Sequence, residues 1–248
     1  NAAQALAVVL NFSTFTGAIV NSGLVTATAT ATTLNRAIAC GLALNGDTLA
    51  GSVSNAGTIT VSASANNTFA VANGITISGN VAGLTSLGIS NSGTILATAN
   101  ANAAANAAEA FGLNVGVGTL LGGITNSGTI IARAGDRLHC GLAVGVYLTA
   151  SSLGGGLVNS GTIAGLVTAG TGTGAGVQVF NGHVAITNTG VIEGSRYGID
   201  LSNDGAASTI NQNGGAIALV GSTGAAIRLS SFADTVNIGG GTIVGNIE

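Results

Sequence analysis

Few residues of this chain could perform chemistry, and they are scattered along it. Hydrolysis of a glycosidic bond requires two carboxylates that flank the bond, but the acids do not gather into such a set. Asp200 and Asp204 lie near loop glycines and could bind Ca²⁺, yet the repeated aspartates of calcium-binding repeats are missing. We therefore expect solvated loop carboxylates. The acids are Asp47, Glu109, Asp136, Glu193, Asp200, Asp204, Asp234 and Glu248.

Histidine and cysteine add little to this set. His139 precedes Cys140, and neighbouring residues of a strand point to opposite faces, so they do not form the oriented pair of a Cys–His nucleophile. His183 lies far along the chain, and a metal site requires three or four converging ligands. The glycine-rich stretches 154–156 and 239–241 lack the Lys-Ser/Thr ending of a phosphate-binding loop. The sequence therefore predicts no catalysis, no metal site and no cofactor.

The composition bounds the class of protein. Among 248 residues there are 42 Gly and no Pro, Trp or Met, and charged residues make up only 5%. Hydrophobic residues make up 46%, the opposite of a disordered chain, and small and β-branched side chains suit a thin, strand-rich core. The formal net charge of −3 offers no basic surface for nucleic acid. No apolar run reaches the ~18 residues of a transmembrane helix.

A short phrase, apolar-x-Asn-x-Gly-x-Ile/Val, recurs along the chain. Its anchoring glycines, with looser copies at Gly215 and Gly241, are separated by 34, 36, 35, 33, 29, 25 and 26 residues. We expect each glycine to permit a positive φ in a turn and each asparagine side chain to bond local backbone at the bend. The predicted structural repeat positions are Asn21, Gly23, Asn55, Gly57, Asn91, Gly93, Asn126, Gly128, Asn159, Gly161, Asn188 and Gly190.

A second phrase, x-Gly-Ile/Leu/Val-x-Val/Leu/Ile, lies between copies of the first. After each Asn-x-Gly, apolar and polar residues alternate, which indicates half-buried strands. Two interleaved phrases with one period predict one coil of strands per period. The second phrase is assigned to CGLAL at 40–44, NGITI at 73–77, FGLNV at 111–115, CGLAV at 140–144, AGVQV at 175–179, YGIDL at 197–201 and AAIRL at 225–229.

The repeat predicts an all-β fold, a right-handed parallel β-helix (β-solenoid) of roughly eight rungs. Segments one period apart would lie on top of each other, about 4.8 Å apart, and the handedness is that of strand crossovers in general. Tandem hairpins would need short turns between adjacent strands, and a helical solenoid would need a 3.6-residue period. We expect one domain over 1–248, with 1–16 as an N-terminal strand or cap and outward loops at 45–50, 64–72 and 100–109.

Stacking would place the cysteines in one column. Cys40 and Cys140 open CGLAL and CGLAV, three rungs or about 14 Å apart, which is too far for a disulfide. A crosslink between molecules of an assembly is the alternative reading.

Two outward columns bear on function. A regular column of Thr58, Thr94, Thr129 and Thr162 is only one residue wide, so strand propensity explains it better than ice binding does. Asp200 is expected to form a surface pair with Arg228 in the second column. That column is predicted to contain Ala43, Thr76, Asn114, Ala143, Gln178, Asp200 and Arg228.

The Asn-Ser-Gly-Thr-Ile repeats and the intervening Gly-Ile/Leu strands resemble bacterial autotransporter passenger domains. The segment from Asp234 to Ile247 resembles the repeats near the C-terminal part of such passengers, and the likeness covers roughly residues 17–248. The resemblance implies a right-handed β-helix that is exported across an outer membrane by a separate β-barrel.

These observations favour an extracellular structural or adhesive surface protein with a β-solenoid stalk, located outside the cell or at a bacterial outer-membrane surface. The expected partners are the chain itself, associating end to end or laterally, or a cell-surface receptor or glycan. We expect no nucleic acid partner and no transmembrane segment in this chain. A self-assembling subunit of an extracellular filament or sheath is the alternative, because no polar capping repeat covers the predicted open strand edges. A β-helix enzyme acting on polysaccharides is a further and less favoured alternative.

Overall fold

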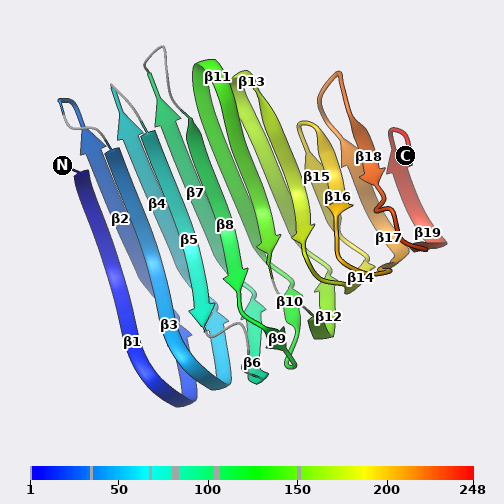
Figure 1. The fold of residues 1–248 in the computed structure, drawn as a ribbon, viewed down its shortest axis with the longest axis horizontal. Coiled ribbons are helices and arrows are strands. Elements are labelled where there is room, and N and C mark those ends of the chain that lie inside the picture. The colour runs from blue at the N-terminus through cyan, green and yellow to red at the C-terminus, as the bar shows by residue number, and fades with distance from the viewer. Residues whose placement is uncertain (1, 34–35, 67–68, 80–83, 103–106, 150–151) are drawn as a thin grey trace.

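The chain winds into a parallel β-solenoid (Figure 1). The computed structural model describes residues 2–33, 36–66, 69–79, 84–102, 107–149 and 152–248, and within them it contains strands and turns but no helix. The described strands pair in parallel, each with strands of the coil before or after it. The predicted all-β solenoid fold is therefore confirmed.

Each coil has three faces, which the register of the pairings defines. Face one follows the Asn-x-Gly turn and contains β2 (Leu24–Ala31), β4 (Thr58–Ala65), β7 (Thr94–Ala101), the first parts of β11 (Thr129–Leu148) and β13 (Thr162–Phe180), β15 (Val191–Gly194), and the last parts of β17 (Thr209–Leu219) and β19 (Thr235–Val244).

Face two contains the second phrase. It is formed by the first parts of β1 (Ala2–Asn21) and β3 (Arg36–Asn55), then β5 (Phe69–Gly79), β8 (Ala108–Gly116), the last parts of β11 and β13, β16 (Tyr197–Asn203) and β18 (Ala225–Arg228).

Face three leads back to the Asn-x-Gly turn. It is formed by the last parts of β1 and β3, then β6 (Leu84–Asn91), β9 (Thr119–Leu120), β10 (Ile124–Asn126), β12 (Ser152–Asn159), β14 (Val184–Asn188) and the first parts of β17 and β19.

The asparagines of the first phrase lie in one file along the stack. Asn55 pairs with Asn21 on one side and with Asn91 on the other, and the file then continues in register through later coils. Segments one period apart therefore lie directly on top of each other, as the repeat predicted. The remaining members are Asn126, Asn159, Asn188, Gln212 and Ile238.

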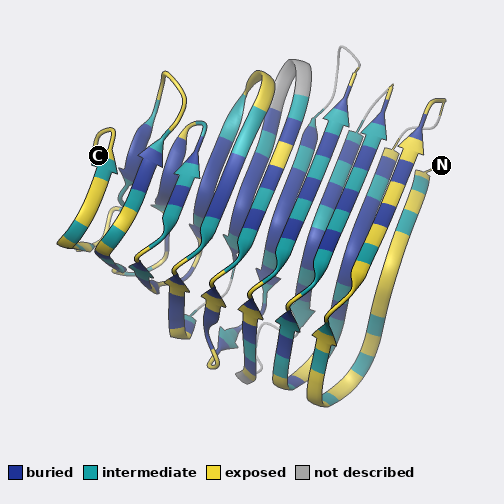
Figure 2. Ribbon diagram, turned by 180° about the vertical axis from the view of Figure 1, so that it is seen from behind, coloured by how far each residue is buried: buried dark blue, intermediate teal, exposed yellow. Residues whose placement is uncertain are grey.

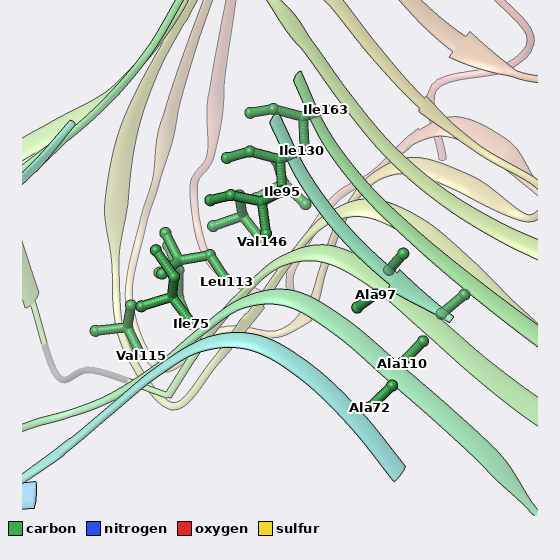
Figure 3. Packing of buried hydrophobic residues seen from close by; sticks show 14 of the residues in the cluster. Ala72, Ile75, Ile95, Ala97, Ala110, Leu113, Val115, Ile130, Val146 and Ile163 are labelled. Carbon is green, nitrogen blue, oxygen red and sulfur yellow. The ribbon is translucent and has the colours of Figure 1, made fainter. Parts of the chain in front are cut away.

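Small side chains make one end of each coil thin. Ala97 of face one is fully buried and packs close to Ala72 and Ala110 of face two (Figure 3). The larger core side chains Ile95 and Leu113 fill the other end of the same coils, toward face three. A cross-section that narrows from branched residues to alanine explains why Ala dominates the inward positions between faces one and two.

The glycine of the second phrase marks a bend in face two. In β3, Ala37 and Ala39 point inward before the bend and Leu42 and Leu44 point inward after it, while Gly41 between them is left out of the ladder. Gly41 lies level with Gly74 of the next coil, so the ladder keeps its register while the inward and outward alternation shifts by one position in each coil.

A side chain does not fit at the glycine copies of this bend, whereas the last coil has Ala226 there. A Cβ added to Gly145 would lie 2.7 Å from Ile163 Cγ2 on face one and 2.6 Å from the carbonyl oxygen of Gly176. The second phrase therefore needs glycine for close approach across the core and along the stack, rather than for an unusual φ.

The glycine of the first phrase is required by stacking as well. A Cβ added to Gly93 would overlap the carbonyl oxygen of Gly57 in the preceding coil. The same carbonyl accepts a hydrogen bond from the Thr94 nitrogen at 2.9 Å. Among the described residues, only the looser copies Gly215 and Gly241 have the positive φ that we predicted for this file, so the prediction was wrong for the stricter copies.

One of the predicted loops is strand throughout, and the other two are strand at their ends. Residues 45–50 belong to β3, where Asn45 donates a side-chain hydrogen bond to Asn11 of the preceding coil at 2.9 Å. Residues 69–72 belong to β5 and 108–109 to β8, so the predicted loops at 64–72 and 100–109 are shorter than expected. Polar outward positions of a ladder resemble loop composition, which explains the error. Residues 2–16 form the first part of β1, in register with β3.

Replacing Gly93 with alanine is expected to lower the free energy of unfolding by ~2–3 kcal/mol, because the added methyl group overlaps the backbone of the neighbouring coil. Gly23→Ala is the matched control, because it changes the same position of the first copy, where an added Cβ has no atom within 4 Å. That variant should stay within ~1 kcal/mol of the wild type. Urea unfolding followed by circular dichroism measures both, and equal losses would contradict the stacking explanation.

Candidate functional site

The asparagines of the first phrase form a ladder of side-chain hydrogen bonds through the interior. Asn91 Nδ2 donates to Asn126 Oδ1 at 2.8 Å, and Asn126 Nδ2 donates to Asn159 Oδ1 at 2.8 Å. The same bond joins the other members in turn: Asn21 to Asn55, Asn55 to Asn91, Asn159 to Asn188, and Asn188 to Gln212.

Each amide of the ladder also bonds main-chain carbonyls. Asn126 Nδ2 donates to Gly128 O within its own turn and to Thr162 O in the next coil, each at 3.2 Å. The predicted local bond at the bend is present, but the bonds between coils were not foreseen. Because Asn126 is fully buried and a buried amide without partners costs ~1–3 kcal/mol, this file has a structural role and carries no chemistry.

The structure corrects the fourth copy of the second phrase. Val144 pairs with Phe111 and with Ala175, so the phrase in that coil is VGVYL at 144–148 and not CGLAV at 140–144. Cys140 pairs instead with Thr171, which means that Cys40 and Cys140 do not share a column. Ala143 is fully buried in the core, and Tyr147 takes the outward place that was predicted for it.

A signal for this register was present in the sequence. In the other early coils the glycine of the second phrase follows the Asn-x-Gly glycine by 18, 17, 19 or 15 residues (23 to 41, 57 to 74, 93 to 112, 161 to 176), whereas 128 to 141 is 13 and 128 to 145 is 17. Spacing within the coil therefore identifies Gly145 as the glycine of the second phrase. The likeness of CGLAV at 140–144 to CGLAL at 40–44 led to the wrong assignment.

The corrected column places Tyr147 two coils from Asp200, with Gln178 between them. Across neighbouring coils of face two, Tyr147 pairs with Gln178, Gln178 with Asp200, and Asp200 with Arg228. A groove of about 300 Å³ opens on this outer surface and is lined by Tyr147, Tyr197, Arg196, Arg228, Asp200 and Gln178, together with Leu142, Thr173, Phe180 and Asn203.

Both tyrosines of the chain lie in this groove, as do two of its five arginines. The Arg196 guanidinium carbon lies 5.5 Å from the centre of the Tyr197 ring, and that of Arg228 lies 5.3 Å from it. Contacts of a guanidinium with an aromatic face are favourable and restrict the conformations of the long side chains. Tyr197 is buried among Phe111, Val144, Ala175 and Ala225 of the same outward file.

Asp200 is not the solvated carboxylate that we predicted. Only 2% of the residue is exposed, because the neighbouring outward side chains cover it. Its Oδ2 accepts a hydrogen bond from Gln178 Nε2 at 3.2 Å, and its Oδ1 accepts one from the Ser202 nitrogen at 3.0 Å. The predicted column with Arg228 is confirmed by the backbone register.

Tyr147 has an environment of its own. Its ring lies 5.3 Å from that of Phe111 in the preceding coil. Burial, and then the charge of Glu109, raise the pKa of the Tyr147 hydroxyl, so it remains a neutral donor and acceptor at neutral pH. Burial also raises the pKa of Glu109, an effect that the charge of Arg36 opposes.

Asp204 is a second buried acid that we predicted to be solvated. Its carboxylate accepts hydrogen bonds from Ser208 Oγ and from the Gly205 nitrogen, and burial raises its pKa. These bonds hold the turn after β16, and Ser208 Oγ in turn accepts a hydrogen bond from the Val184 nitrogen. The role of Asp204 is therefore to organise a bend.

The remaining nucleophile and base candidates include one close pair. Ser152 Oγ lies 3.2 Å from His183 Nε2, but no carboxylate of the described chain hydrogen-bonds His183, so the group that orients the imidazole of a Ser–His pair is missing. Cys40 has a free thiol, and burial raises its pKa, which disfavours the reactive thiolate. The side chains of His139 and Cys140 lie outside the described residues.

The predicted threonine column is present, but the outward column beside it is not made of threonines. Thr58, Thr94, Thr129 and Thr162 pair in order. The next outward column of face one changes from Thr60 to Leu96 and Ile131, so a flat two-column array of threonines is not formed there.

Over the described ranges, no three residues among His, Cys, Asp and Glu are grouped as a metal would require. The same part of the chain contains no helix with the length and apolar character needed to cross a membrane. Comparisons with protein-family models, with curated proteins and with solved structures found no match. The groove on face two is therefore the candidate functional site, on its geometry alone.

Replacing Asn126 with alanine is expected to lower the free energy of unfolding by ~3 kcal/mol. The change removes the side-chain acceptor of Asn91 Nδ2 and the side-chain donor to Asn159 Oδ1, and both atoms stay buried. Asn21→Ala, at the first position of the ladder, breaks a single ladder bond and should cost ~1 kcal/mol. Denaturant unfolding of both variants gives the comparison. Losses of equal size would show that continuity of the ladder does not contribute.

Proposed function

We propose that this chain is an extracellular structural and adhesive protein of a bacterial cell surface, in which the solenoid is a stalk and performs no catalysis. The observation that carries the proposal is the uninterrupted stack of coils with its buried amide ladder. Such a stack is stabilised by contacts between neighbours alone, so it forms a column without a large globular core.

The distribution of side chains supports a stalk. Buried and more exposed residues alternate along the strands (Figure 2). From β4 to β7 the inward Ile59 is matched by Ile95, while the outward Thr60 is matched by Leu96. A column of this kind can vary its outer surface without changing its core. The resemblance of the Asn-Ser-Gly-Thr-Ile repeats to passenger domains supports a location outside the cell, and a surface receptor, a glycan or a second copy as the partner.

An antibody against the purified chain should label intact producing cells, and protease added outside should remove the label, because an exported stalk is accessible from the medium. A cytoplasmic protein of the same cells is the control for intact envelopes. Labelling that requires permeabilised cells would contradict the location. Turnover of a polysaccharide by the purified chain, lost in Asp200→Asn, would contradict the absence of catalysis.

One observation favours self-assembly as a second candidate function. Large exposed apolar side chains gather on the two end coils: Val20 (66%) and Leu24 (71%) at one end, Ile238 (62%) and Val244 (53%) at the other. Open strand edges with apolar side chains promote pairing between chains. In the purified chain, pairing of these end coils between molecules would form a filament.

Electron microscopy and sedimentation of the purified chain test this candidate. Fibres formed by the wild type should disappear in Val20→Lys and Leu24→Lys, because edge lysines oppose strand pairing. Val158→Lys is the matched control, since Val158 is exposed (43%) in the middle of the stack on β12. A wild type that stays monomeric at high concentration would eliminate the filament.

A further inference from the structure

The groove on face two concentrates groups that are sparse over the rest of the described surface. It is formed by outward residues of β11, β13, β16 and β18, in coils that follow one another. Charged residues make up only 5% of the chain and aromatic residues 3%, yet Tyr147, Tyr197, Arg196, Arg228 and Asp200 all line one groove. Part of this gathering also joins neighbouring coils, since Gln178 donates a hydrogen bond to Asp200 and Tyr197 packs in a buried file.

A change in coil length contributes Arg196. In the coil of β13, residues 166–174 separate Gly165 from Ala175, whereas in the next coil only residues 195–196 separate Gly194 from Tyr197. The shorter connection places Arg196 directly before Tyr197, over whose ring its guanidinium lies. The side chain therefore stands at the edge of the groove, exposed to solvent.

The polar groups of the groove are held before any ligand binds. Arg196 and Arg228 rest against the Tyr197 ring, and Asp200 is fixed by Gln178 and by the Ser202 nitrogen. Pre-organised groups lose little conformational entropy on binding. Planar guanidinium, carboxylate and amide groups beside a half-buried tyrosine combine directional hydrogen bonding with an amphipathic ring.

Charge narrows the class of ligand. Two guanidiniums and one carboxylate give the groove one excess positive charge, in a chain whose formal net charge is −3. Arginine binds carboxylate and sulfate oxygens with two parallel N–H donors. Gln178, whose amide is held by Asp200, offers an acceptor and a donor for hydroxyl groups, and Tyr147 offers a ring for the C–H face of a sugar.

We propose that this groove binds an acidic saccharide, a sugar chain that bears carboxylate or sulfate groups. Arg196 and Arg228 bind the anionic group, Gln178, which Asp200 holds in place, binds ring hydroxyls, and Tyr147 packs against the sugar ring. The proposal rests on the adhesive part of the proposed function and gives its ligand a chemical class and a site.

Isothermal titration of the whole chain tests the proposal with four probes: oligogalacturonate for carboxylate, a heparin-derived oligosaccharide for sulfate, a cello-oligosaccharide as the neutral sugar, and oligoglutamate as an acidic chain that is not a sugar. At least one acidic oligosaccharide should bind more tightly than the neutral one and than oligoglutamate, and more weakly as salt is raised. The tighter of the two acidic sugars identifies the anionic group. Oligoglutamate binding as tightly would overturn the proposal, and so would the absence of acidic-sugar binding at millimolar concentration.

Variants separate the roles of the residues. Arg228→Gln should weaken the acidic sugar at least tenfold and leave the neutral sugar within twofold, whereas Arg228→Lys should retain part of the affinity. Tyr147→Ala should weaken both sugars, and Tyr147→Phe, which keeps the ring, should weaken them less. Arg133→Gln is the matched control, because Arg133 is an exposed arginine of face one and should not matter. An equal loss in Arg133→Gln would overturn the assignment of the groove.

Thermal unfolding of each variant excludes loss of fold as the cause. The two proposals can also fail separately. Labelling only of permeabilised cells would contradict the surface location but not saccharide binding measured on the purified protein. A surface-exposed chain that binds no saccharide would contradict only the proposal for the groove.

Discussion

Main-chain hydrogen bonds between successive coils are the constraint on which the rest of the structure depends. They require that every residue lie above the equivalent residue of the preceding coil. The Asn-x-Gly turn meets this requirement with main-chain and with side-chain hydrogen bonds. The carbonyl oxygen of Asn55 accepts hydrogen bonds from the Ser92 and Gly93 nitrogens of the next coil, at 2.8 and 3.0 Å, and the Asn55 side chain bonds Asn91. A slip of one residue would turn every inward side chain outward and would bury the amides without partners.

Close stacking also explains why the core is made of small residues. Faces one and two approach each other where both present alanine, as Ala97 and Ala110 do, and alanine gives up no side-chain entropy on burial. Glycine is required where two files meet, because Gly145 lies against Ile163 across the core. The composition that first distinguishes the chain, rich in Gly and Ala, is thus the composition that stacked coils of this thickness require.

The sequence predicts most of this fold because the fold is periodic. The phrase around Gly57, Gly93 and Gly128 fixes the length of a coil, and alternation fixes which residues point inward. The ladder between coils could not be predicted, because the repeat shows that Asn recurs but not whether its amide points into the core. The column of Asp200 was predicted except at one coil, where Cys140-Gly141 and Val144-Gly145 compete within one long strand and only the pairing decides.

That one coil determines whether a candidate site is visible. With Ala143 in the column, Asp200 has only Gln178 and Arg228 beside it and resembles any surface acid. With Tyr147 there, the same register brings a ring, an amide, a carboxylate and a guanidinium together in four successive coils. Arg196 cannot be placed from periodicity at all, because it enters where the period shortens from 29 to 25 residues and the connection between faces one and two contracts. The periodic positions of a solenoid specify its fold, and departures from the period are where a distinct surface can arise.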